Sequence, residues 1–140
     1  MIAAYEAADE AASAALAPPT PDPEHPDLLA THTGPMLEQR QTVARGLAAD
    51  GRAIRLPESS RYRVEVESVE FDPDDPEVAF LTTCAVDDGE RFVVETGEVI
   101  AEGLYTIAFT EAMQRVDGTW KLAERREENR WEGEAGCAVD

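Results

Sequence analysis

Two cysteines, Cys84 and Cys137, are the side chains with the most definite chemistry in this sequence. They lie 53 positions apart, and two cysteines allow one intramolecular disulfide. Such a bond would close a loop worth roughly 4 kcal/mol in a chain-entropy description and would tie the C-terminal tail to an earlier strand. We expect this disulfide, which implies an oxidising compartment. The alternative is a pair of thiols in a cytoplasmic protein.

The other reactive residue types do not form a recognisable motif. The histidines, His25 and His32, lie in a proline-rich stretch and near a helix start, where we expect them to be solvated rather than catalytic. The sequence contains no metal-ligand spacing, glycine-rich phosphate loop or nucleophile elbow. The acidic segment 72–75 lacks the remaining ligands of a calcium loop and predicts a plain turn. We therefore expect no cofactor and no metal.

The composition is strongly acidic. Of 140 residues, 30 are Asp or Glu and 12 are Lys or Arg, which gives a net charge of −18. This charge repels nucleic-acid phosphates and anionic lipid head groups, so we expect neither as a partner. No run of about 18 apolar residues occurs, so we expect no transmembrane segment. Abundant alanine with Lys121 as the sole lysine indicates a high-GC genome such as an actinobacterial one, with a halophile as the alternative.

The first third of the chain predicts helices separated by prolines. Residues 1–17 are rich in alanine and contain no helix breaker, while their acids argue against a signal peptide. Residues 18–26 hold five prolines and predict an extended loop. Residues 27–50 predict a short helix capped by Asp27 and a longer helix with Arg40 on its polar side.

After residue 60 the pattern changes to the two-residue period of antiparallel strands. Residues 78–86 are almost all apolar or Thr, so we expect a central strand covered on both faces. Asp117-Gly118 is the strongest turn signal in the chain and predicts a type I′ hairpin. The predicted strands are 62–68, 78–86, 91–96, 104–116 and 120–131, with turns at 72–76 and 87–89 and a looser connection over 97–103.

The order of these elements predicts a single α+β domain over residues 1–140, with three helices before about five antiparallel strands. Strands of about 12 residues normally twist and bend. We therefore expect N-terminal helices packed in a strongly curved antiparallel sheet over residues 60–131, followed by a tail over 132–140.

Several short motifs occur along the chain in a fixed order. They are Pro26-Asp-Leu-Leu-Ala30, Thr33-Gly34-Pro35-Met36-Leu37, Gly51 with Arg55, Cys84 with Asp87, Thr96-Gly97, Asp117-Gly118-Thr119-Trp120-Lys121-Leu122, and Trp131-Glu-Gly133 with Cys137. This series resembles the NTF2-like (SnoaL-like) superfamily, an α+β cone, and is most similar to its small exported or lipoprotein-type actinobacterial members. The resemblance covers roughly residues 3–138 and depends on the order, because each motif alone is degenerate.

The resemblance implies that a catalytic acid or base would lie at the open mouth of the cone. A carboxylate desolvated there by apolar walls would have a raised pKa and could accept a proton. Asp87, at the end of an apolar strand, is the best candidate, ahead of Glu95, Tyr105 and Glu111. The competing interpretation is that Asp87 belongs to a simple hairpin turn ending at Gly89.

Aromatic and charged residues give the expected binding surfaces. We expect Tyr105, Phe109 and Trp120 at the ligand pocket, either lining it or filling it. The mixed-charge run 124–130 predicts a solvated outer face with cross-strand pairs. Its alternative is a homodimer contact through the sheet, which the net charge of −18 opposes.

Three functional hypotheses follow. The first is a non-enzymatic extracytoplasmic domain, its signal removed, that binds a small apolar ligand or a partner protein at the mouth of the cone. The second is an enzyme of the isomerase, polyketide cyclase or epoxide hydrolase type, in which Arg63 or Arg91 could supply a cation beside an inward acid. The third is a structural dimerisation or assembly domain. The superfamily contains catalytic and non-catalytic members, so the fold does not choose among them.

Overall fold

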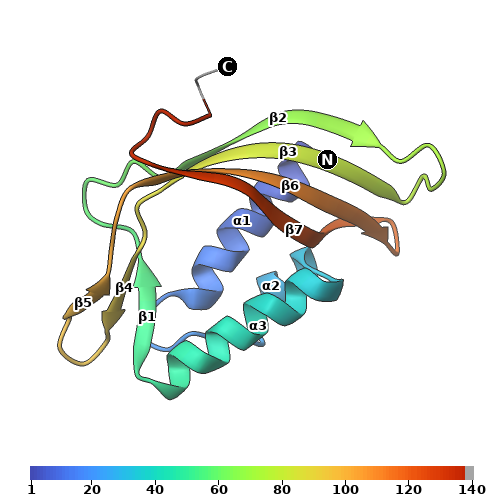
Figure 1. The fold of residues 1–140 in the computed structure, drawn as a ribbon. Coiled ribbons are helices and arrows are strands. Elements are labelled where there is room, and N and C mark those ends of the chain that lie inside the picture. Colours follow the sequence, from blue (N-terminus) through green and yellow to red (C-terminus); the bar gives the residue numbers. More distant parts are fainter. Residues whose placement is uncertain (138–140) are drawn as a thin grey trace.

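The computed structural model describes residues 1–137, which form three helices and seven strands (Figure 1). The helices are α1 (Ile2–Leu16), α2 (Pro26–Thr31) and α3 (Gly34–Ala49). The strands are β1 (Arg52–Arg55), β2 (Arg63–Phe71), β3 (Val78–Asp87), β4 (Glu90–Val93), β5 (Val99–Ala101), β6 (Tyr105–Val116) and β7 (Thr119–Glu132). The predicted α+β class is confirmed, as is the order of helices before strands.

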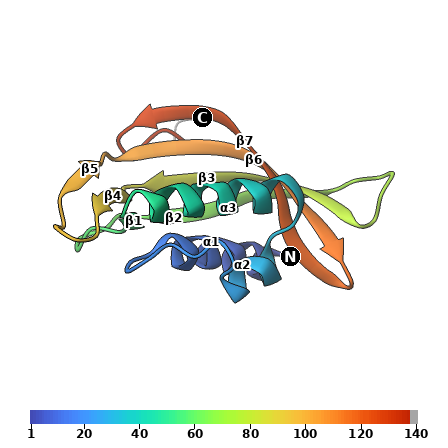
Figure 2. The ribbon, with the colours of Figure 1, turned by 90° about the horizontal axis from the view of Figure 1, so that it is seen from below.

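The strands form two antiparallel sheets. The larger sheet has the order β2-β3-β6-β7 and the smaller one has the order β1-β4-β5. Figures 1 and 2 show the three helices on one side of the larger sheet, with the smaller sheet beyond one end of it. Strands β1 and β5 were not predicted, because they contain only 4 and 3 residues and are ordered by pairing with β4.

Strand β3 is central in the larger sheet, but the prediction that both of its faces are covered was wrong. Leu81 and Thr83 point to the helices and are buried, whereas Phe80 and Thr82 point to the other face and are exposed. The helices occupy one side of the sheet, so one face of β3 remains open over part of its length.

The interpretation of residues 87–89 as a hairpin turn was also wrong. Strand β3 pairs with β2 and β6, whereas β4 pairs with β1 and β5. The chain therefore passes from one sheet to the other at Asp88 and Gly89, and it carries the end of β3 to the boundary between the two sheets.

Local turn chemistry was predicted correctly elsewhere. Asp117 and Gly118 have φ angles of 51° and 81°, as a type I′ turn requires, and they join β6 to β7. In the acidic turn after β2, the side chains of Asp72 and Asp75 accept hydrogen bonds from the backbone NH groups of Asp74 and Glu77. These carboxylates are engaged in holding the turn.

A compact apolar cluster fills the space between the helices and the hairpin end of the larger sheet. Its buried members are Tyr5, Ala8, Met36, Leu81, Met113 and Leu122. On α1, the side chains of Tyr5, Ala8, Ala12 and Leu16 are buried, whereas Ile2 at its start is 46% exposed. Helix α2 starts one residue early, because His25 rather than Asp27 provides the side-chain cap. No helix within residues 1–137 has the length and apolar character needed to cross a membrane.

Candidate functional site

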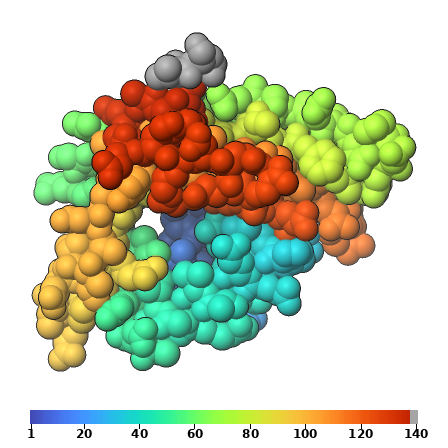
Figure 3. All heavy atoms as spheres, in the orientation of Figure 1, coloured from blue at the N-terminus to red at the C-terminus, as the bar shows by residue number. Residues whose placement is uncertain are grey.

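A cavity of about 550 Å³ lies between α1, β1 and the inner face of the larger sheet. Figure 3 shows the molecule hollowed between β7 and α3, with atoms of α1 at the bottom of the hollow. Its walls are largely apolar, with Ala12 and Leu16 from α1 and Ile54 and Leu56 from β1 and the segment after it. Small-molecule sites in proteins have volumes of about 300–1,000 Å³, so this cavity is large enough for a ligand.

A second depression, of about 370 Å³, adjoins the cavity at its mouth. The two share Ile54, Asp87 and Gly89. Tyr105 and Arg130 line the outer depression, and the Arg130 guanidinium lies 5.2 Å from the centre of the Tyr105 ring. The shared residues mark the passage between the mouth and the interior.

One end of the inner space holds a buried ion pair. Glu111 on β6 is 1% exposed and lies opposite Arg125 on β7 in the strand register. Arg125 Nε donates to Glu111 Oε1 at 2.5 Å, and the Thr83 hydroxyl donates to Glu111 Oε2 at 2.7 Å. Arg125 Nη2 also donates to the Tyr5 hydroxyl at 3.2 Å. Both carboxylate oxygens of Glu111 thus have partners inside the fold.

Asp9 and Tyr62 form a second polar pair, on the cavity wall. The Tyr62 hydroxyl donates to Asp9 Oδ1 at 2.5 Å, and both side chains line the cavity. Burial raises the pKa of the Asp9 carboxyl above its ordinary value, although the hydrogen bond from Tyr62 opposes that shift. Burial and the charge of Asp9 also raise the pKa of Tyr62. Asp9 is therefore an inward carboxyl group that retains its proton more readily than a surface aspartate.

Arg40 on α3 faces the same cavity. The sequence pattern had placed Arg40 on the polar side of this helix, which was expected to face solvent. Burial and the neighbouring Arg125 lower the pKa of Arg40 to about 10. Its Nε is buried, and within residues 1–137 it has no hydrogen-bond partner. A periodic pattern alone could not reveal this, because the cavity lets a polar residue on the helix face inward.

His32 was expected to be solvated, and this prediction was wrong: it is 1% exposed. The backbone explains the position, since His32 forms a bridge with Leu122 on β7 and the NH of Thr33 donates to the Leu122 carbonyl. Burial, with the charges of Arg40 and Arg125, lowers the pKa of His32 to about 4. His32 is therefore neutral at physiological pH.

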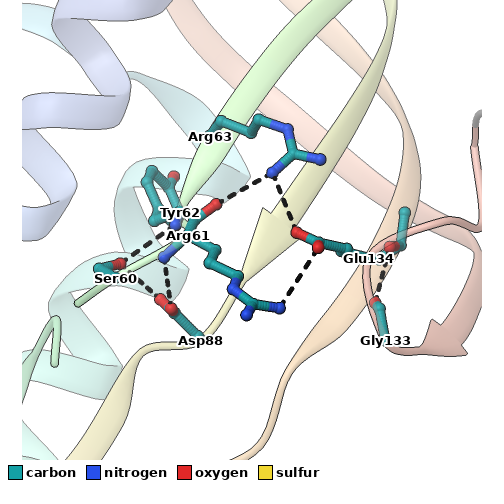
Figure 4. A network of polar contacts seen from close by, with 8 residues as sticks. Ser60, Arg61, Tyr62, Arg63, Asp88, Gly133 and Glu134 are labelled. Carbon is teal, nitrogen blue, oxygen red and sulfur yellow. Dashed lines mark hydrogen bonds and ion pairs between the residues drawn. The ribbon is translucent and has the colours of Figure 1, made fainter.

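Figure 4 shows how the segment before β2, which carries Tyr62, is fixed in place. Asp88, in the connection between the two sheets, accepts hydrogen bonds from the Ser60 hydroxyl and the Arg61 backbone NH, each at 2.6 Å. These contacts hold the two residues before Tyr62 against the end of β3. Asp88 is thus a positioning residue for the cavity wall.

The C-terminal tail crosses the opposite face of the larger sheet. Cys137 is bonded to Cys84, whose side chain points away from the helices, so the predicted disulfide is confirmed. Glu134 forms ion pairs with Arg61 at 3.3 Å and Arg63 at 3.4 Å (Figure 4). The Thr106 hydroxyl donates to the Gly133 carbonyl at 2.8 Å. The tail therefore ties the outer face to the segment that carries Tyr62.

The structure separates the site residues predicted from the sequence. Asp87 lies on the passage between mouth and cavity, where its Oδ1 accepts the backbone NH of Gly89 at 2.8 Å. Tyr105 lies at the mouth. Phe109 packs against Arg125, whose guanidinium carbon lies 4.3 Å from the centre of the Phe109 ring. Trp120 packs on the core cluster and on Phe71, at the far end of the sheet from the cavity.

The cavity-wall pair of Asp9 and Tyr62 was not among the predicted site residues. Asp9 interrupts the apolar face of the first helix between buried Ala8 and Ala12, and this interruption is the signal that could have identified it. Arg125 was assigned to a solvated run, but its side chain is only 17% exposed and is paired with Glu111. The homodimer contact predicted for residues 124–130 remains a prediction, in which Arg125 is not available on the outer face.

Comparison with known proteins supports the fold and leaves the activity open. No protein-family model matches the chain, and no curated protein matches it. Among solved structures, the chain is similar to the intermembrane-space region of the chloroplast protein ARC6, with a TM-score of 0.69 and 16% sequence identity. The match covers 89% of this chain and 91% of that one, so the architecture is shared over almost the full length.

Proposed function

We propose that this protein is an NTF2-like domain that acts outside the cytoplasm and binds a small, largely apolar molecule in the cavity between α1, β1 and the larger sheet. The observation that carries the proposal is the cavity of about 550 Å³, with apolar walls and a few convergent polar groups. The extracytoplasmic location is supported by the Cys84–Cys137 disulfide, since such bonds persist in oxidising compartments.

The binding proposal is tested by blocking the cavity. Ser13 is an exposed residue on the rim of the cavity, so Ser13→Trp places a large ring at its opening. Ala7→Trp introduces the same ring at an exposed position of α1 that does not line the cavity. Native mass spectrometry of protein purified from its own host should show a bound molecule in the wild type and in Ala7→Trp and none in Ser13→Trp. A molecule retained equally by all three proteins would place binding elsewhere.

A second candidate function is proton-transfer catalysis on a molecule held in the cavity. The observation in its favour is Asp9, an inward carboxyl with a raised pKa beside the Tyr62 hydroxyl at 2.5 Å. Asp87, the acid favoured from the sequence, lies farther out, on the passage. The test is hydrogen-deuterium exchange at carbon in the bound molecule in heavy water. Asp9→Asn should abolish this exchange and Asp87→Asn should retain it; exchange that survives in Asp9→Asn contradicts the candidate.

A further inference from the structure

The arginines on the cavity wall are unevenly paired. Arg125 is paired with Glu111 at 2.5 Å, and Arg55 is paired with Glu90 at 2.9 Å. Arg40 faces the same cavity, but no carboxylate in residues 1–137 lies within ion-pair distance of it. Its buried Nε also has no acceptor in this part of the chain. A buried donor without an acceptor destabilises a folded protein, and a ligand in the cavity that accepts from Arg40 would remove this cost.

The carboxyl group of Asp9 does not supply that acceptor. Its Oδ1 accepts a hydrogen bond from the Tyr62 hydroxyl at 2.5 Å, and within residues 1–137 it forms no hydrogen bond with the Arg40 Nε. Arg125 adds a second positive charge near Arg40 and lowers the Arg40 pKa further. The wall around Arg40 therefore combines a buried guanidinium nitrogen that has no acceptor in residues 1–137 with a second arginine that is already paired.

We propose that Arg40 binds the carboxylate of a small amphipathic acid whose hydrocarbon part occupies the cavity. The proposal rests on the proposed function and adds the chemical class of the ligand. A guanidinium presents its donors in a planar fork that matches the two oxygens of a carboxylate. The apolar residues Leu16 and Ile54, on the same cavity wall, provide contact for a hydrocarbon chain.

The test compares decanoate with decanamide, two probes of equal length that differ in charge, by isothermal titration calorimetry at neutral pH. The variants are Arg40→Gln and, as a matched control on the same helix, Arg45→Gln, whose side chain is 58% exposed. The wild type and Arg45→Gln should bind decanoate about ten- to a hundredfold more tightly than decanamide, because the carboxylate adds charged hydrogen bonds. Arg40→Gln should lose this preference.

Each other outcome overturns a different statement. If the wild type binds decanoate and decanamide with equal affinity, and Arg40→Gln binds them with the same affinities, the role of Arg40 is overturned. Binding in the cavity is then still supported. Absence of binding by either probe overturns both the anchor and the proposed cavity function.

A stability measurement guards against a variant that fails for structural reasons. Arg40→Met keeps an unbranched apolar stem in place of the arginine stem and removes the unpaired charge, so the melting temperature of the ligand-free protein should rise by about 3–6 °C. Arg40 would then be costly for folding and needed for binding. A fall in melting temperature would overturn the proposal, because it would mean that the fold itself satisfies the guanidinium.

Discussion

The two ends of the space beneath the larger sheet accommodate buried charge in different ways. At the filled end, Glu111 and Arg125 are paired, and Thr83 and Tyr5 complete their hydrogen bonds beside a packed apolar cluster. At the hollow end, Arg40 faces a cavity, and its Nε has no hydrogen-bond partner among residues 1–137. Paired charges whose hydrogen bonds are completed by neighbouring side chains stabilise the fold, whereas a buried donor without a partner beside a cavity is typical of a binding site.

The largest effect should come from breaking the filled end. Glu111→Gln is expected to lower the free energy of unfolding by about 3–5 kcal/mol, because it leaves Arg125 buried without its counter-charge. Urea denaturation measures the change. Glu77→Gln is the matched control: Glu77 pairs with Arg115 at 2.6 Å, but both side chains reach solvent, so stability should change little. Equal losses in the two variants would contradict the contrast between buried and exposed pairs.

The tail should contribute to stability without contributing to the cavity. Replacing both Cys84 and Cys137 by Ala is expected to lower the free energy of unfolding by about 2–4 kcal/mol, because the unfolded chain gains freedom. The bond lies on the face away from the helices, so the affinity for decanoate should stay within about twofold of the wild type. A parallel collapse of affinity would show that the tail also shapes the hollow end.

A smaller effect is expected at the hollow end. Tyr62→Phe removes the hydrogen bond to Asp9 and should lower the free energy of unfolding by about 0.5–1.5 kcal/mol. Tyr105→Phe, at the mouth, serves as the control and should cost less, because water reaches that position. Chemical denaturation of both variants under the same conditions makes the comparison, and an equal loss would remove the special role of the Asp9–Tyr62 pair.

The smallest and most specific effect is a dependence on pH. The pKa of Asp9 is raised in the folded protein, so the folded state holds this proton more tightly than the unfolded state does. This favourable contribution is complete below the ordinary aspartate pKa of 3.8 and is lost as pH rises through the folded-state value. The Asp9→Asn variant has no carboxyl group at this position and does not lose this contribution as pH rises. The free energy of unfolding of the variant minus that of the wild type should therefore increase with pH. Unfolding curves from pH 3 to pH 7 measure this difference, and a difference that shrinks with pH would reverse the sign.

Local sequence patterns predicted most of the elements because their causes are local. Alanine-rich residues 1–17 form a helix wherever they lie, and Asp117-Gly118 adopts positive φ angles that suit a two-residue hairpin. The short strand β1 was missed, since its order depends on β4, which is distant in sequence. Strand β5 was missed because it contains only 3 residues and is ordered by pairing with β4. The covering of β3 was misjudged because composition shows that a strand is apolar without showing how many layers pack on it.

The candidate site was the least predictable part of the molecule. Asp87 was placed near the mouth, but the deeper residues Asp9, Arg40 and Tyr62 come from three separate segments that only the packing of α1, α3 and β2 brings together. His32 and Arg125 had the sequence context of solvated residues and are instead held inside by contacts with β7 and β6.

The sequence by itself determined the acidic charge, the α+β order, the hairpin at Asp117-Gly118 and the one disulfide that two cysteines allow. These follow from composition and from interactions between near neighbours in the chain. The tertiary structure decided which charged side chains turn inward and where an empty volume remains beside them. That outcome depends on the packing of distant elements, since a buried charge is tolerated only where a partner or a cavity from another segment meets it.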